Sequence, residues 1–193
     1  MTALQFTEAI QTIPLTKDEY ATIGFTGSAC DEFIANHTIQ PKQDPQGFPP
    51  IDELIILVSE YDMTKVPIGL LWFDEVVSLD DDFFQIGTLC ATSLCICRYT
   101  GEVLIIPDYD IDDDDGSYTL DTPANQRHRC ALTGATFLDA LLYADTFLEK
   151  SCIDPFIIDN TRVVETVAEH CAELAGGGDY LEFWMAFLRS EFL

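Results

Sequence analysis

Aspartate is concentrated in one short stretch, DYDIDDDDG at residues 108–116, in which six of nine residues are acidic. Calcium-binding loops use carboxylates at alternating positions, and Asp110, Asp112 and Asp114 fit the first, third and fifth positions of such a loop. The sixth position, which needs glycine for a sharp turn, is another aspartate. Asp121 stands at the twelfth position, where it replaces the usual bidentate glutamate poorly. The spacing therefore predicts weak, nonspecific attraction of cations rather than a specific calcium site.

A second acidic cluster, LDDDF at residues 79–83, precedes a strand that we expect to pair into the same sheet. Two such clusters on one sheet form a negative face, which attracts a basic protein and raises its association rate by about 10–10³. The alternative is a pair of solvated loops that only keep the protein soluble. On the first interpretation the candidate partner-binding residues are Asp80, Asp81, Asp82, Asp108, Asp110, Asp112, Asp113, Asp114 and Asp115.

The whole chain is also strongly acidic. Its 193 residues contain 34 acidic and nine basic side chains, for a net charge of -25. Such a field repels nucleic acid and anionic membranes and attracts basic proteins. Hydrophobic residues make up 48% of the chain, which is too many for a disordered acidic tail. We therefore expect a folded protein whose partner is a basic protein, although solubility or a salt-rich habitat would also explain the charge.

Catalytic motifs are absent from the sequence. The histidines at positions 37, 128 and 170 are scattered, and the chain has no H-E-x-x-H, G-x-S-x-G or P-loop pattern. We expect no enzyme activity, no cofactor and no bound metal. A metal-dependent hydrolase is the less favoured alternative, because aspartate clusters can hold Mg²⁺. The one basic cluster, RHR at residues 127–129, is expected to pair with the chain's own acidic surface rather than to bind an anion.

The seven cysteines indicate a reducing compartment. They are odd in number, form no C-x-x-C pair, and are interpreted as buried free thiols rather than metal ligands. Cys95 and Cys97 fall on one face of an expected strand. The N-terminal residues lack the features of a signal peptide, and no apolar run is long enough for a membrane helix. These features predict a cytoplasmic protein.

The elements that must position these residues are short strands followed by helices. A helix over 28–37 with Ser28 as its N-cap and a proline-rich loop at 40–50 come first. We expect strands at 54–58, 68–73, 83–89, 94–99 and 102–106, the last two joined at Thr100-Gly101 in a tight hairpin turn. Helices follow over 134–150, over 161–175 and in DYLEFWMAFLRSEFL at the end. This order predicts an α+β fold with an antiparallel sheet flanked by helices.

The helices at 134–150 and at the C-terminal end have marked apolar faces. Phe137, Leu141 and Leu148 belong to one stripe that we expect to be buried, with Asp139 and Asp145 on the other side. The last helix carries an aromatic face that we expect to close the protein's own core. The alternative is that this face docks a partner or a second copy as a homodimer; its residues are Phe183, Trp184, Phe187 and Phe192.

The middle of the chain resembles the SUKH superfamily, which includes bacterial immunity proteins and yeast cell-wall assembly regulators. The resemblance rests on Ile86-Gly87, on SLCICRYTGEVLII and on ATFLDALLYADTFL, and more loosely on GFTGSACDEFIANHTI. It spans roughly residues 20–150. ANQRHRCALTG stands where members often carry an Asn-Ser stretch, and the region after residue 155 has no clear counterpart.

The resemblance implies a noncatalytic binding protein. In the immunity branch the partner is a nuclease or another toxin domain, which agrees with the acidic charge. The alternative is an intracellular scaffold or regulatory module of the same fold. We expect a single domain over 1–193, with a SUKH-like core at 1–155 and a helical C-terminal extension at 156–193.

Overall fold

A five-stranded antiparallel sheet, in the order β1-β2-β3-β4-β5, is the centre of the fold. The computed structural model describes residues 1–66, 68–90, 92–107 and 127–191. Helices accompany the sheet, so the predicted α+β class with a helical C-terminal region is confirmed. The strands are β1 (Leu71–Ser78), β2 (Phe83–Leu89), β3 (Thr92–Cys97), β4 (Val103–Pro107) and β5 (His128–Ala131).

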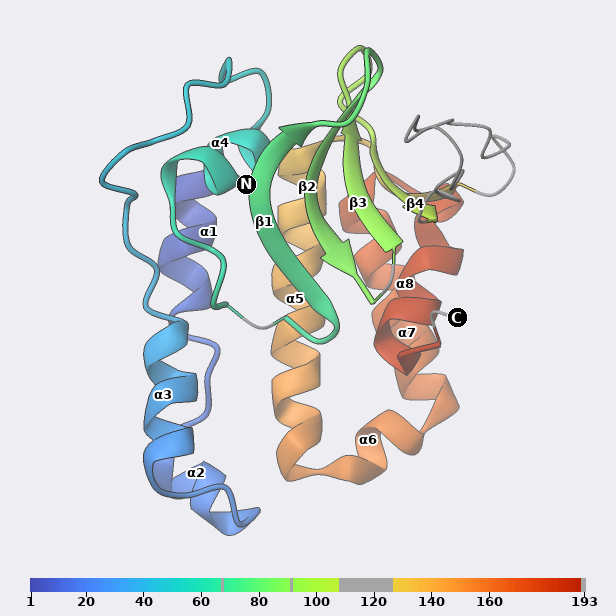
Figure 1. Cartoon of the computed structure of the whole chain (residues 1–193). Helices are drawn as coiled ribbons and strands as arrows, with labels where there is room; N and C mark the ends of the chain where they lie inside the picture. Colours follow the sequence, from blue (N-terminus) through green and yellow to red (C-terminus); the bar gives the residue numbers. More distant parts are fainter. Residues whose placement is uncertain (67, 91, 108–126, 192–193) are drawn as a thin grey trace, which may run out of the picture.

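Helices flank this sheet on several sides. Figure 1 shows α5 behind the sheet, α1 and α4 on the side of β1, and α7 and α8 on the side of β4. The short α2 and α3 project away from the sheet, beside the far end of α5. The bounds are α1 (Ala3–Ile10), α2 (Lys17–Thr22), α3 (Ser28–Asn36), α4 (Glu53–Glu60), α5 (Gly134–Ile153), α6 (Pro155–Asp159), α7 (Thr161–Ala175), the 3-10 turn η2 (Gly178–Tyr180) and α8 (Leu181–Arg189).

The β3–β4 hairpin is present as the sequence predicts. Ile96 lies opposite Val103 in antiparallel register. Gly101 has a φ of +75°, which suits glycine, and it donates its N–H to the Cys97 carbonyl at 2.9 Å. The strands have the expected lengths but shifted bounds: β3 ends at Cys97 and β4 begins at Val103, so the connection is longer than a two-residue turn.

The main core fills the space between the sheet and the helices. Phe137 and Leu141 of α5 are fully buried, as predicted, whereas Leu148 is only partly buried. Trp184 of α8 packs against the Phe137 ring with 5.8 Å between centroids, and its indole N–H donates to the Cys130 carbonyl at 3.2 Å. The C-terminal helices therefore complete the same core as the sheet.

The predicted strand at 54–58 is wrong, because these residues lie in helix α4. The Asp52 side chain accepts the N–H of Leu54 at 2.7 Å and caps the helix. Leu54, Leu57 and Val58 are buried at helical spacing. A short apolar run cannot be assigned from periodicity alone, and the N-cap aspartate was the signal that favoured a helix.

Strand β1 also differs from its predicted bounds of 68–73. Ile68 and Leu71 form an isolated bridge around Gly69, whose φ is +56°, so the strand starts only at Leu71. It then continues past the acidic pair at 74–75, where the register with β2 shifts between Phe73 and Val77. This β-bulge lets the strand accommodate two consecutive exposed side chains without ending.

Of the N-terminal helices, α3 was predicted from the sequence, whereas α1 and α2 were not. Helices α1 and α2 each begin with a capping box, formed by Thr2 with Gln5 and by Thr16 with Glu19. The predicted N-cap of α3, Ser28, is wrong: Gly27 takes that position and makes no side-chain cap. A glycine at the cap provides the positive φ of 77° that the chain adopts there.

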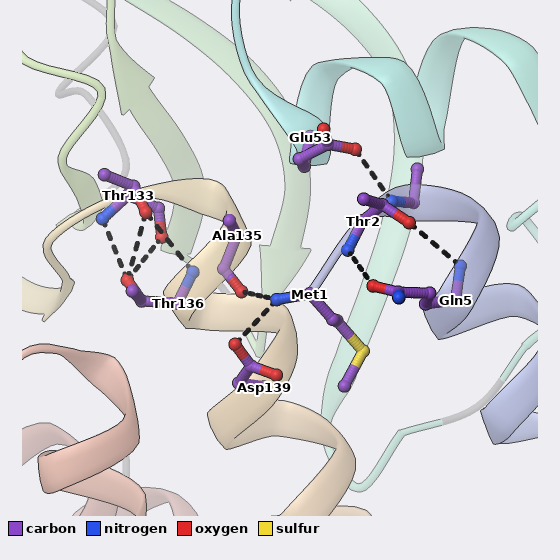
Figure 2. A network of polar contacts seen from close by, with 9 residues as sticks. Met1, Thr2, Gln5, Glu53, Thr133, Ala135, Thr136 and Asp139 are labelled. Carbon is purple, nitrogen blue, oxygen red and sulfur yellow. Dashed lines mark hydrogen bonds and ion pairs between the residues drawn. The ribbon is translucent and has the colours of Figure 1, made fainter.

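Helix α1 is joined to α4 and α5 by polar contacts (Figure 2). The amino group of Met1 lies 2.6 Å from the Asp139 carboxylate and donates to the Ala135 carbonyl at 3.1 Å. The Ala3 N–H donates to Glu53 at 2.8 Å. Asp139, predicted to lie on the polar side of α5, is half-exposed and serves as the anchor for this end of the chain.

Candidate functional site

The structure places only part of the predicted acidic site. Asp80, Asp81 and Asp82 form the turn between β1 and β2. The rest of the predicted site lies outside the described residues, as does the calcium-loop spacing considered for it; these are Asp108, Asp110, Asp112, Asp113, Asp114 and Asp115.

The three aspartates of the β1–β2 turn have two different roles. The Asp80 carboxylate accepts the backbone N–H groups of Asp82 at 2.6 Å and of Phe83 at 2.8 Å. Asp80 is half-buried and shapes the turn, as aspartates commonly do in this position. Asp81 and Asp82 are exposed. The charge of this turn is therefore presented to solvent by Asp81 and Asp82.

The β3–β4 turn lies beside the acidic turn at the same end of the sheet (Figure 1). The Arg98 N–H donates to the Asp82 carbonyl at 2.8 Å. The Arg98 side chain turns away from the aspartates: its guanidinium lies 3.9 Å from the centroid of the Phe84 ring and bonds to Ser78. The nearest arginine therefore leaves the carboxylates of Asp81 and Asp82 unneutralised.

One residue of the basic cluster at 127–129 pairs with the chain's own acidic side chains, as predicted. Arg129 forms ion pairs with Glu102 and, at 3.2 Å, with Asp179. Arg127 precedes β5 and has its guanidinium 5.0 Å from the centroid of the Phe83 ring. The prediction that RHR pairs with the chain's own acidic surface is thus confirmed for Arg129.

Two acidic residues that sequence reasoning missed are buried together on α5. Asp145, placed by prediction on the polar side of this helix, is only 3% exposed, and Glu149 one turn later is also buried. Tyr20 of α2 donates to Glu149 at 2.8 Å, whereas one oxygen of Asp145 has no partner among the described residues. Burial and the Glu149 charge raise the pKa of Asp145 to about 7.

The cysteines are free thiols, but not all are buried as predicted. Cys90 and Cys152 are exposed. Cys95 and Cys97 share the sheet face opposite the main core, as the strand pattern indicated. Burial raises the pKa of Cys95 to about 12, so this thiol is not activated as a nucleophile. The chain's other buried thiols are Cys30, Cys130 and Cys171.

The described residues do not assemble a metal centre. Nowhere in them do three His, Cys, Asp or Glu side chains gather closely enough to hold an ion. Asp145 and Glu149 form a pair without a third ligand. The arrangement they support is a buried, proton-sensitive contact between α2 and α5.

The aromatic face of α8 is turned inward. Phe183, Trp184 and Phe187 are all buried in the chain's own core, which confirms the favoured interpretation. The alternative, a homodimer through this aromatic face, required exposed side chains that the structure buries. Phe192 lies outside the described residues.

Comparison with known proteins does not place the chain in a family. It matches no family model, no curated protein and no solved structure. In the described part of the chain, no helix combines the length and hydropathy needed to cross a membrane.

Proposed function

We propose that this chain is a noncatalytic protein-binding module of SUKH type, acting in the cytoplasm as an immunity protein. Its partner would be a basic, nuclease-type toxin domain held against an acidic surface. The observation that carries the proposal is the pair of exposed carboxylates on Asp81 and Asp82, which no described basic side chain neutralises.

The distribution of the few basic residues supports this function. Arg98 is held on Phe84, and Arg129 is held by Glu102 and Asp179. The arginines near this end of the sheet are therefore engaged within the chain. A basic active site that binds a phosphate backbone meets a comparable array of negative charge on this surface.

A reconstitution experiment tests the function. The probe is a purified basic nuclease domain encoded by a gene adjacent to this protein's own, mixed with the full chain and analysed by size exclusion with light scattering. We expect a one-to-one complex and loss of the toxin's nuclease activity. Intact nuclease activity at saturating protein, or no complex, would contradict an immunity function.

A pair of matched variants separates this surface from net charge. Asp81→Asn with Asp82→Asn removes two charges from the β1–β2 turn. Glu165→Gln with Glu169→Gln removes two exposed charges from α7. Only the first variant should weaken inhibition of the toxin, because steering depends on where the charges lie.

A further inference from the structure

The outer face of β1, turned away from the main core, carries exposed apolar side chains. Leu71 and Phe73 point into the core, while Trp72 and Val77 are 47% and 52% exposed. Trp72 is paired with Thr88 of β2. A half-exposed tryptophan on a strand loses the stabilisation that burial would give it, which makes this position a candidate contact for another molecule.

This apolar row continues across the sheet. The same face carries a small buried cluster over β2, β3 and β4, formed by Phe83, Cys95, Leu104 and Ile106. Gln85 of β2 lies between the two parts, opposite Val77 on one side and Cys95 on the other. The outer face of the described sheet therefore carries apolar side chains among polar ones, and over β1 the apolar side chains are open to solvent.

Acidic side chains follow Trp72 in β1 and in the turn after it. Asp74 and Glu75 occupy the bulge between Trp72 and Val77, and both are exposed. Asp81 and Asp82 follow in the turn at the end of the strand. Residues 66–97 contain no lysine or arginine. The charged side chains of β1 and its turn are thus all acidic, while Arg98 and Arg127 nearby lie over the Phe84 and Phe83 rings. The acidic charge complements a partner surface that is apolar and basic.

An exposed indole on a strand that also carries exposed carboxylates suits one kind of side chain in particular. An arginine guanidinium stacks on an aromatic face, and its fork of N–H groups bonds to carboxylates at the same time. Tryptophan and arginine are also the residues that most often dominate the free energy of protein interfaces. Lysine offers only a point charge and stacks less well.

We infer that the outer face of β1 is the docking surface for the basic partner, with Trp72 receiving an arginine side chain and the acidic residues of β1 and its turn holding the surrounding cations. The inference rests on the proposed protein-binding function and adds where the partner docks and which side chain anchors it. The occupant is a protein surface that presents arginine beside apolar residues.

The test uses octa-arginine as the probe and octa-lysine as its comparison, titrated into the ¹⁵N-labelled full chain and followed by NMR. We expect the largest shifts at the Trp72 indole N–H and at Val77. Trp72→Ala should weaken octa-arginine binding about two- to fivefold, as expected for loss of an exposed cation–π contact. Trp72→Phe, which keeps a ring, should bind nearly as the natural chain does and should fold if the alanine variant does not.

Phe156→Ala is the matched control. Phe156 is 83% exposed on α6, away from β1, so its removal should leave the affinity unchanged. Equal effects of Trp72→Ala and Phe156→Ala, or shifts centred on the glutamates of α7, would overturn the docking surface. If salt-dependent binding of the peptide persists in that case, acidic protein binding stands and only its location fails. A dimer of the chain alone that Trp72→Ala dissociates would assign the surface to a second copy and also overturn the inference.

Discussion

Asp145→Asn should stabilise the protein at neutral and alkaline pH. The Asp145 carboxylate is buried beside Glu149 under Tyr20, and no cation pairs with it among the described residues. Its charge is therefore unfavourable in the folded state and favourable in the unfolded chain. Asparagine keeps nearly the same shape and carries no charge, so it removes this cost.

The magnitude follows from the pKa of Asp145. Its folded value of about 7 compares with an ordinary value of 3.8. A difference of that size corresponds to at most about 4 kcal/mol of stability. Because the folded pKa is raised, the protonated carboxyl contributes fully below about pH 4, and its contribution is lost as the pH rises through about 7. The advantage of the asparagine variant should therefore be absent in acid and largest above pH 7.

Urea unfolding of the two proteins across this pH range is the assay. The quantity compared is the difference in the free energy of unfolding between variant and natural chain at each pH. Asp81→Asn makes the same chemical change on an exposed residue and should show a flat difference near zero. A variant that is less stable than the natural chain at pH 8, or a difference that does not change with pH, would refute the buried, uncompensated charge.

Other substitutions test the fold and the turn. Leu141→Ala should lower the free energy of unfolding by about 2–5 kcal/mol, because it leaves a cavity in the core; a shift in the urea midpoint too small to resolve would contradict its place there. Asp80→Ala should cost about 1–2 kcal/mol through the loss of two backbone hydrogen bonds, and Asp81→Ala nearly nothing, in the same assay. Gly134→Ala should prevent stable folding, seen as loss of the cooperative thermal transition, because its new Cβ would lie 1.8 Å from an oxygen of Asp52.

The sequence predicted best those elements that glycine and apolar periodicity delimit. Helix α7 has the predicted bounds of 161–175, because GGG ends it, and the β3–β4 hairpin follows from the glycine between two apolar strands. Helix α4 was misassigned because five consecutive apolar residues have no clear period. Strand β1 extends past Asp74 and Glu75 because it pairs with β2, and no local sequence pattern encodes that pairing.

The candidate site was predictable only in part. The exposed Asp81 and Asp82 follow from a polar turn between two apolar strands. Asp145, by contrast, was assigned to the polar side, although it lies four residues after Leu141 on the buried stripe. The helical spacing therefore predicts a buried position for Asp145, but its acidic side chain led to the opposite assignment. The exposure of Trp72 depends on which elements cover the sheet, and that is a property of the tertiary fold.

Association kinetics with the proposed toxin partner test the central claim most directly. At about 10 Å through water, each lost charge pair is worth about 0.4 kcal/mol, so removing the charges of Asp81 and Asp82 should slow association about fourfold at low salt. Dissociation should hardly change. The difference should vanish between about 0.01 M and about 1 M salt, as the Debye length falls from about 30 Å to about 3 Å. An association rate for the double asparagine variant equal to that of the natural chain at low salt would contradict an acidic binding surface at this turn.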